Sequence, residues 1–419
     1  MIRTIRAVAL GCLGAGMVLC APASASATTL YVGSRVAAPG NSCTNPGYVS
    51  IQTALNAAES GNTIEVCGGA YKEQLHIEKS VTLKGLANPT VSLPATPANS
   101  ETTCDLERNA ARGGEDQDLV SICTPGTVTI EKVTFEAKWP ESTCDDSLYN
   151  ILVAGGATLD ATSAKIDGAG AFPLDGCQGG VGIQIGSQAG DQVGHATLTK
   201  TAIENYQKNG ITVDGSGSSA AITSSTITGA GPAAIGQNGI QVSRGAVANI
   251  NKVKVSDDEC DLVGVCGAGS SLEWEEDAAG VLFYEAGASS TVSSSKLTDN
   301  DIGVEYVSGS ASRPATPELS LTADQVHGGD ASVQLNEGNA TLNNDKLLGA
   351  RVGLDINSYY GEANEYAPIA EVLGGKVEGS RAAVQVERDL GNLPGRLTLT
   401  GAKLHGFIVK EDPEFEVIQ

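Results

Sequence analysis

Glu305 and Asp355 occupy the same predicted outward position two repeats apart, and Glu387 lies one repeat after Asp355, offset by two residues. Each follows a short apolar run in which alternate side chains would point away from the interior of a strand. With about 4.8 Å between stacked strands, Glu305 and Asp355 would lie roughly 10 Å apart, and Asp355 and Glu387 roughly 8 Å apart. Inverting glycosidases separate their two carboxyl groups by about 6.5–9.5 Å, so either pair is a candidate general acid and general base.

Amide side chains share the predicted outward face with these carboxylates. Aligning the repeats gives a first outward ladder of Gln184, Thr212, Gln241, Leu282, Glu305, Gln334, Asp355, Gln385 and Ile408. It gives a second outward ladder of Asp214, Ser243, Tyr284, Val307, Asn336, Asn357, Glu387 and Lys410. Such a face suits a polyhydroxylated chain, with Tyr284 able to stack on a sugar ring. The predicted substrate-binding residues are Gln241, Tyr284, Gln334, Asn336, Asn357 and Gln385. A solvated polar surface, or ligand binding without catalysis, explains the same residues.

A repeat of paired aliphatic residues positions these ladders. Two aliphatic residues five apart recur down the chain, as in Leu198/Ile203 and Ile222/Ile227, and Gly210 to Val213 is one of the apolar segments between the pairs. A period of 20–30 residues indicates a solenoid, and short aliphatic runs between Gly, Ser and Asn indicate strands. We therefore predict an all-β, right-handed parallel β-helix of three strands per coil and about eleven coils, in a single domain over residues 28–419.

An amphipathic helix is predicted near the start of this domain. In the segment from Ser50 to Ala58, Ile51, Ala54 and Leu55 share one face and Ser50 can cap the N-terminus. Because a solenoid must cover its first open coil, we expect residues 28–85 to form an N-terminal cap and the first coil.

The first 27 residues have the pattern of a secretory signal. Arg3 and Arg6 precede an apolar stretch of about 13 residues, and Ala25-Ser26-Ala27 is a small-residue cleavage site, so the mature chain is expected to begin at Thr28. The stretch is shorter than the roughly 20 residues of a membrane span. The formal charge is −23. It disfavours nucleic acid as a partner and is compatible with cation binding or simply with solubility.

Ten cysteines include Cys12 and Cys20 of the predicted signal, which leaves eight in the exported chain. An even number in an exported protein indicates disulfides. Because each coil of a solenoid touches only its neighbours, sequential pairing is expected. The predicted pairs are Cys43–Cys67, Cys104–Cys123, Cys144–Cys177 and Cys260–Cys266.

One interval of the repeat is long because of a predicted acidic insertion at residues 256–278, which contains eight carboxylates. Several carboxylate oxygens could bind Ca²⁺, although the spacing fits no EF-hand and a solvated acidic loop is the alternative. No other metal site or cofactor is predicted.

The segments from Tyr48 to Ala58 and from Gly61 to Val66, followed by Gly69-Ala70-Tyr71-Lys72-Glu73 and Val81 to Gly85, resemble the N-terminal part of pectin methylesterases and related pectin-lyase-like proteins. The resemblance covers about 40 residues and implies the right-handed parallel β-helix. The catalytic motifs of these families have no counterpart in the later coils. Polygalacturonases carry acids where this chain has Asn209 and Asn238, and a Gly-His-Gly motif does not occur.

We therefore predict a secreted protein that binds an extracellular or cell-surface glycan through its outward ladders. The alternative is a divergent polysaccharide lyase or glycoside hydrolase that uses Glu305, Asp355 and Glu387. The fold does not decide between them, and the sequence leaves open whether the protein is an enzyme.

Overall fold

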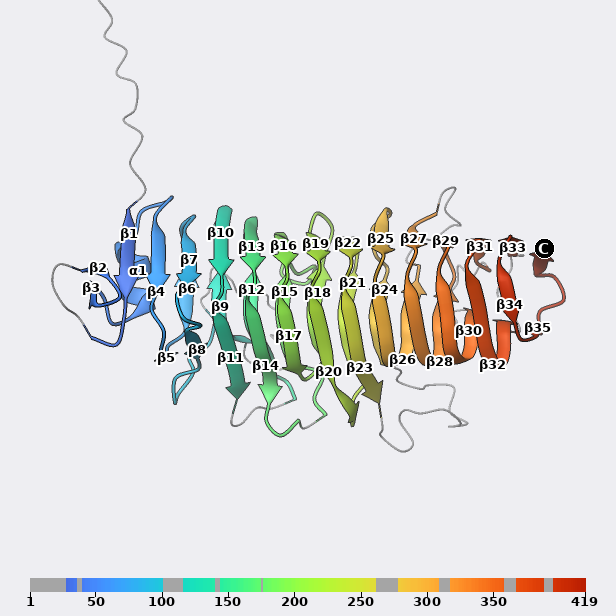
Figure 1. Cartoon of the computed structure of the whole chain (residues 1–419), viewed down its shortest axis with the longest axis horizontal. Helices are drawn as coiled ribbons and strands as arrows, with labels where there is room; N and C mark the ends of the chain where they lie inside the picture. Colours follow the sequence, from blue (N-terminus) through green and yellow to red (C-terminus); the bar gives the residue numbers. More distant parts are fainter. Residues whose placement is uncertain are drawn as a thin grey trace, which may run out of the picture.

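The computed structural model describes residues 28–35, 40–100, 116–139, 144–174, 176–260, 278–308, 317–357, 367–387 and 395–419. Its strands stack along one long axis from the N-terminal to the C-terminal end (Figure 1). Nearly all strand pairs are parallel, and each strand pairs with its equivalent in the preceding and following coils. This arrangement confirms the predicted parallel β-helix.

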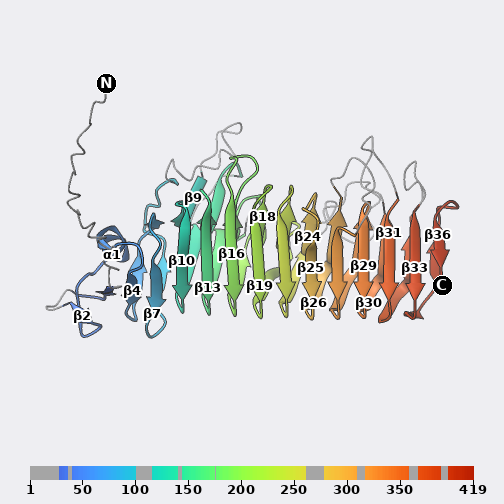
Figure 2. The same cartoon turned by 90° about the horizontal axis from the view of Figure 1, so that it is seen from above.

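Three faces run the length of the stack, which Figure 2 shows from a second direction. The first face consists of β1 (Thr29–Val32), β4 (Thr63–Val66), β7 (Thr82–Gly85), β10 (Gly126–Glu131), β13 (Ala157–Thr162), β16 (Gly194–Thr199), β19 (Ser219–Thr223), β22 (Val247–Asn251), β25 (Ser290–Ser293), β27 (Leu319–Thr322), β29 (Asn339–Asn343), β31 (Ile369–Leu373), β33 (Arg396–Thr400) and β36 (Glu416–Ile418).

The second face consists of β5 (Ala70–Lys72), β8 (Thr90–Ser92), β11 (Thr134–Trp139), β14 (Lys165–Ala171), β17 (Ala202–Tyr206), β20 (Thr226–Ala233), β23 (Lys254–Cys260) and β34 (Lys403–His405). The third face consists of β6 (Leu75–Ile77), β9 (Asp116–Ile122), β12 (Ser147–Val153), β15 (Val181–Ile185), β18 (Asn209–Asp214), β21 (Asn238–Ser243), β24 (Ala279–Tyr284) and β35 (Ile408–Lys410).

Four long strands belong to both the second and the third face. They are β26 (Lys296–Val307), β28 (Gln325–Asn336), β30 (Lys346–Asn357) and β32 (Lys376–Val386). The pairing of β26 shifts between Leu297 and Ile302, at the corner where the strand passes from one face to the next. With these four, the described third face has twelve rungs, one more than the predicted eleven or so.

Aliphatic side chains fill the interior. Leu198 and Ile203, one of the repeated pairs, are buried on β16 and β17, and Ile211 and Val213 are buried on β18 of the same coil. Each of the three strands thus contributes inward residues to one continuous core. The period-2 alternation of β18 leaves Thr212 on the opposite side of the strand, as the sequence predicts.

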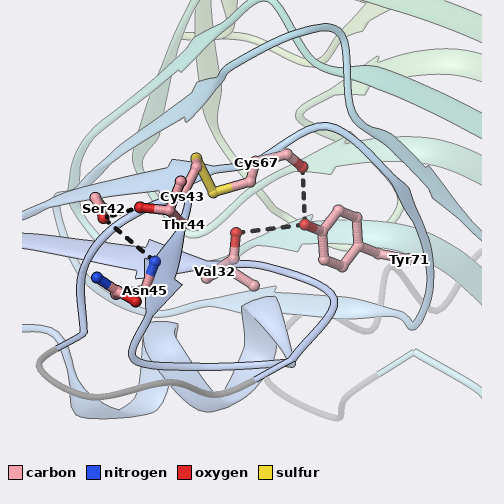
Figure 3. Close-up of a disulfide and its surroundings, with 7 residues drawn as sticks. All are labelled: Val32, Ser42, Cys43, Thr44, Asn45, Cys67 and Tyr71. Atoms are coloured by element: carbon pink, nitrogen blue, oxygen red, sulfur yellow. Dashed lines mark hydrogen bonds between the residues drawn. A yellow bond between two sulfur atoms is a disulfide. The ribbon is translucent and has the colours of Figure 1, made fainter.

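The predicted N-terminal helix is α1 (Ile51–Ala57), and Ser50 is its N-cap, accepting from the Thr53 backbone N–H at 3.1 Å. Glu73 extends the cap. Its carboxylate accepts from the Ile51 N–H at 2.8 Å and from the Ser50 hydroxyl at 2.7 Å. The Tyr71 hydroxyl lies 2.8 Å from the Cys67 carbonyl oxygen, to which it donates (Figure 3). The Gly-x-Tyr-x-Glu motif of the resemblance is therefore architectural here, since it fastens the cap to the first coil.

Two predicted disulfides are present. Cys43–Cys67 joins the loop carrying the short antiparallel strands β2 (Asn41–Ser42) and β3 (Asn45–Pro46) to the first coil (Figure 3), and Cys144–Cys177 joins the approaches to β12 and β15. Cys123 and Cys260 are also disulfide-bonded. Their predicted partners, Cys104 and Cys266, lie outside the described residues, as does the predicted signal.

The predicted insertion at 256–278 begins later than expected. Ser256 to Cys260 continue β23 and pair with β20 and β26, so these residues belong to the regular strand. Residues 261–277, with the remaining carboxylates, lie outside the described part of the chain. Within that described part, no helix is both long and apolar enough to cross a membrane.

Candidate functional site

The first outward ladder exists in the predicted order on the third face. Gln184, Thr212, Gln241, Leu282, Glu305, Gln334, Asp355 and Gln385 are successive register partners on β15, β18, β21, β24, β26, β28, β30 and β32. We call this row the polar ladder. The prediction was wrong at its last member, because β35 enters the register one residue later and places Val409, not Ile408, beside Gln385.

The second outward ladder is also in register from Asp214 through Ser243, Tyr284, Val307 and Asn336 to Asn357. Its predicted end was wrong for the same reason. Lys410 pairs with Val386 rather than with Glu387, which directly follows β32. Glu387 is therefore left without an ammonium group opposite it in the ladder.

A closed hydrogen-bond network occupies the polar ladder at β18 and β21. The Asn209 amide nitrogen donates to Thr212 Oγ1 and Gln241 Oε1, each at 2.9 Å, and Asn209 Oδ1 accepts from Asn238 at 3.0 Å. The Gln241 amide donates onward to Ser243 Oγ at 3.3 Å. These side chains satisfy one another, so this part of the face is built as a rigid scaffold.

Asp214 ends this network and is fully buried. Ser243 Oγ donates to its Oδ1 at 2.9 Å, Arg244 Nη2 lies 2.8 Å from the same oxygen, and the Gln188 N–H donates to Oδ2 at 2.9 Å. Burial opposes ionisation, yet the hydrogen bonds and the charge of Arg244 hold the pKa of Asp214 below its usual value. Arg244 follows β21 directly and was not predicted to have this role.

Glu305 lies on β26, is half-buried, and accepts one hydrogen bond from the Asn336 amide at 3.1 Å. Burial raises the pKa of Glu305 to about 7, against the opposing charge of Lys208. A carboxyl group in this condition is a proton donor at mildly acidic pH. Glu305 is therefore partly protonated near neutral pH.

Asp355 lies two rungs from Glu305 on β30, with only 8% of its surface exposed. Its Oδ2 accepts from the Gln334 amide at 3.2 Å. Burial raises the pKa of Asp355 to about 7, the charge of Glu387 adds to this shift, and Arg351 and Arg381 oppose it. Glu387 in turn accepts a hydrogen bond from the Gln385 amide.

The structure gathers most of the predicted site residues and separates two of them. Glu305, Asp355 and Glu387 lie together with Gln334, Asn336, Asn357 and Gln385 on β26 to β32. Gln241 lies two rungs before Glu305, inside the closed network, and half-buried Tyr284 lies between the two groups at the end of β24. Asn209, Asn238 and Arg244 were missed, because the alternation rule predicts which way a side chain points and not its partner.

A pocket of about 270 Å³ lies beside the scaffold, at the start of β12, β15 and β18. Tyr149, Lys208 and Asn209 line it, and Cys144 forms part of its wall. In the described residues, no group of three or more His, Cys, Asp or Glu side chains is arranged to hold a metal ion. The predicted Ca²⁺ binding by the acidic insertion concerns mainly residues 261–277, so it stays a prediction.

No protein-family model matches the chain, and no curated protein matches it. Among solved structures, the Dettilon tailspike protein is similar with a TM-score of 0.54 at 13% identity, over 91% of this chain and 68% of that one. A pectate lyase has a TM-score of 0.43 at 10% identity, over 92% and 78%. A periplasmic alginate epimerase has 0.45 at 11% identity, over 86% and 84%. At these identities the likeness concerns the fold, and the chain is a right-handed parallel β-helix.

Proposed function

We propose that this protein binds an extracellular polysaccharide lengthwise along the polar ladder of the third face. The observation that carries the proposal is the register: amide and carboxyl side chains follow one another on successive rungs from Glu305 to Gln385. Sugar hydroxyls both donate and accept hydrogen bonds, so a row that alternates amides with carboxyl groups offers a partner to each.

Export of the protein is part of the same proposal. The disulfides Cys43–Cys67 and Cys144–Cys177, with Cys123 and Cys260 also bonded, suit an oxidising compartment. The predicted signal at residues 1–27 provides the route. A glycan outside the cell is the ligand that such a protein would meet.

Cleavage of the bound polysaccharide, by hydrolysis or elimination, is the second candidate function. The observation that favours it is the pair Glu305 and Asp355, two rungs or roughly 10 Å apart along the face. Each carboxyl group is held by an amide from the intervening strand β28, Glu305 by Asn336 and Asp355 by Gln334. A pair oriented in this way could protonate a glycosidic oxygen and activate a water molecule.

The test is a screen of the purified full-length protein on neutral and acidic polysaccharides, with and without Ca²⁺, for retention in polysaccharide-containing gels and for product release. We expect retention on at least one glycan. Glu305→Gln and Asp355→Asn should abolish any product release. The matched control is Glu371→Gln, the same change at an exposed position on the first face. Retention without products would leave a binding protein, and neither retention nor products on any glycan would refute both functions.

A further inference from the structure

Asp355, Gln385 and Glu387 together hold more acceptors than donors. Asp355 and Gln385 are register partners on adjacent strands, and Glu387 follows two residues after Gln385. Between the two carboxylates the only donor that the described residues place there is the Gln385 amide nitrogen, and it is used by Glu387. Asp355 Oδ1 and Gln385 Oε1 are buried and have no hydrogen-bond partner among the residues that the structure describes.

Turning the Gln385 amide does not remove the shortage. In the other orientation the nitrogen would face Asp355, and the carbonyl oxygen would face the Glu387 carboxylate. One amide cannot donate to carboxylates on both sides, because its two ends differ chemically. In either orientation one acceptor oxygen of these three side chains therefore has no donor from the other two, which is unfavourable unless a positive group lies beside it.

Arg351 and Arg381, the cations that act on Asp355 in the described part of the chain, do not supply that positive group. Arg351 Nε pairs with Asp330 at 3.3 Å, and Arg381 is exposed on the next rung. Both act on Asp355 only through their charge, since the one hydrogen bond to Asp355 in the described part of the chain comes from Gln334. The site thus keeps an excess of acceptor oxygen beside two fixed positive charges.

We propose that Asp355, Gln385 and Glu387 form a binding site for a hard divalent cation, with Ca²⁺ as the preferred ion. Both orphaned oxygens belong to side chains that are more than nine-tenths buried, with 8% and 3% of their surfaces exposed. Stacked register partners lie about 4.8 Å apart, and two Ca–O bonds of about 2.3–2.6 Å span that separation. Carboxylate and amide oxygens are the ligands that Ca²⁺ prefers, and its flexible geometry tolerates ligands drawn from two rungs.

Three protein groups do not complete a Ca²⁺ shell, which takes about six to eight oxygens. Water or ligand hydroxyl groups fill the other positions. With few protein ligands and two arginines nearby, we expect a weak site, with a Kd of about 10⁻⁴–10⁻³ M, in the range of extracellular calcium modules. The site does not depend on glycan binding, because its ligands come from the chain itself.

The proposed ligands are not part of the predicted acidic insertion at residues 256–278. The site also competes with the hydrolytic role of Asp355, since a carboxylate bound to a metal is unavailable as a proton donor. Measurements of Ca²⁺ binding and of product release therefore distinguish three cases: a glycan-binding protein with the site, one without it, and a hydrolase that needs the free Asp355 carboxyl group.

The experiment measures Ca²⁺ and Mg²⁺ binding to the full-length protein by calorimetry at pH 8, after removal of metal with EDTA. We expect Ca²⁺ to bind more tightly than Mg²⁺, and Asp355→Asn and Glu387→Gln each to weaken Ca²⁺ binding at least tenfold. Glu371→Gln is the matched surface control and should change nothing. Glu387→Gln also serves if Asp355→Asn fails to fold, because Glu387 is only half-buried.

A second control separates this site from the acidic segment. The triple variant Glu273→Gln, Glu275→Gln and Glu276→Gln removes three carboxylates of that segment, and we expect it to leave the Ca²⁺ affinity unchanged. The proposal is overturned if the wild-type chain binds neither cation. It is equally overturned if Ca²⁺ affinity survives Asp355→Asn and Glu387→Gln and is lost in the triple variant.

Discussion

The coils around β14 to β21 and the coils around β26 to β32 hold their acidic side chains in different ways. In the earlier coils the acids are paired with cations. Asp167 lies 3.2 Å from Lys138 and 3.3 Å from Lys165, and Asp214 lies 2.8 Å from Arg244. Although burial opposes ionisation at both, hydrogen bonds and these cations keep the pKa of Asp167 and of Asp214 below its usual value.

Several acids of the later coils have no ion pair with a described residue. Asp324 accepts from the Ser295 N–H at 2.6 Å, and Asp345 one rung on accepts from the Asp324 N–H at 2.8 Å. Both lie in turns between the first and second faces and are almost fully buried. Burial raises the pKa of Asp324 to about 6 and that of Asp345 to about 7. Glu305 and Asp355 on the third face follow the same pattern.

The difference shows that one backbone repeat supports two kinds of surface. Where an acid is paired with Arg244 or a lysine, it is a fixed structural charge. Where an acid is buried without an ion-pair partner, it gains or loses a proton, or binds a cation, near neutral pH. The candidate site belongs to the second kind, and the network around Asn209 to the first.

The largest expected effect of a substitution on stability comes from removing Arg244, the cation that is paired with the buried Asp214. Arg244→Ala would leave the fully buried Asp214 with hydrogen bonds and no counter-charge. We expect a loss of about 3 kcal/mol in the free energy of unfolding, measured in urea. Arg351→Ala, which breaks the exposed pair with Asp330, is the control and should cost less than about 1 kcal/mol. Equal losses of stability in the two variants would show that the buried pair of Asp214 and Arg244 contributes no more than an exposed pair.

The second effect is the dependence of stability on pH. Because Asp324 and Asp345 have pKa values raised from 3.8 to about 6 and about 7, their stabilising contribution is complete below about pH 4 and is lost as pH rises through 6 and 7. Between pH 5 and 8 we expect the titration of these two groups to cost the metal-free protein about 4 kcal/mol of stability. Asp214, with its lowered pKa, stays ionised throughout this window.

Thermal unfolding across pH 5 to 8 in EDTA measures this loss. Asp345→Asn should flatten the profile, because the amide keeps an acceptor for the Asp324 N–H and does not ionise. A wild-type stability that rises steadily with pH over this range would contradict the assignment.

The third effect contrasts substitutions of the same kind in the two regions. Asp355→Asn supplies an amide donor next to the unpartnered Gln385 oxygen, so in EDTA at pH 8 we expect a gain of up to about 1 kcal/mol. Asp214→Asn removes the partner of Arg244 and should destabilise the fold. The urea midpoint should rise in Asp355→Asn and fall in Asp214→Asn. Midpoints that move in the same direction would contradict the distinction between acids paired with cations and buried acids without an ion pair.

The smallest effect concerns exposed pairs. Lys165 is 41% exposed and lies 2.6 Å from Glu204 as well as 3.3 Å from Asp167. Lys165→Met should cost about 0.5 kcal/mol or less in 0.1 M salt and nothing measurable in 0.5 M salt, because exposed pairs are screened. A loss of unfolding free energy that salt does not reduce would show that Lys165 behaves like the buried pair of Asp214 and Arg244.

The sequence predicted the ladders well because strand alternation and the repeat fix both direction and register. From Gln184 to Gln385 every partner on the third face is the expected one. At β35 the alignment was wrong by one residue, since nothing in the local pattern reveals where a strand enters its neighbour's register. The helix α1 and its Ser50 cap were predictable for a local reason, a capping residue before an amphipathic segment.

Partnerships across rungs were not predictable. Asn209 bonds to Thr212 and Gln241, and Asp214 to Arg244, through side chains that come together only in the folded stack. Whether an outward acid is buried also depends on neighbouring coils, so Asp355 and an exposed residue such as Glu371 look alike in sequence. The acidic insertion was placed too early because β23 is longer than the repeat suggests.

The central claim, that the third face binds a polysaccharide, is tested most directly by paired double variants in polysaccharide affinity gels. One variant joins Glu305→Gln to Gln334→Ala on the polar ladder, and the other joins Glu371→Gln to Asn249→Ala at exposed positions on the first face. Neither variant substitutes a proposed cation ligand, although Gln334→Ala removes the amide that donates to Asp355. The account predicts at least a tenfold loss of affinity for the retained glycan in the first variant and none in the second. Equal affinities in the two variants would contradict it.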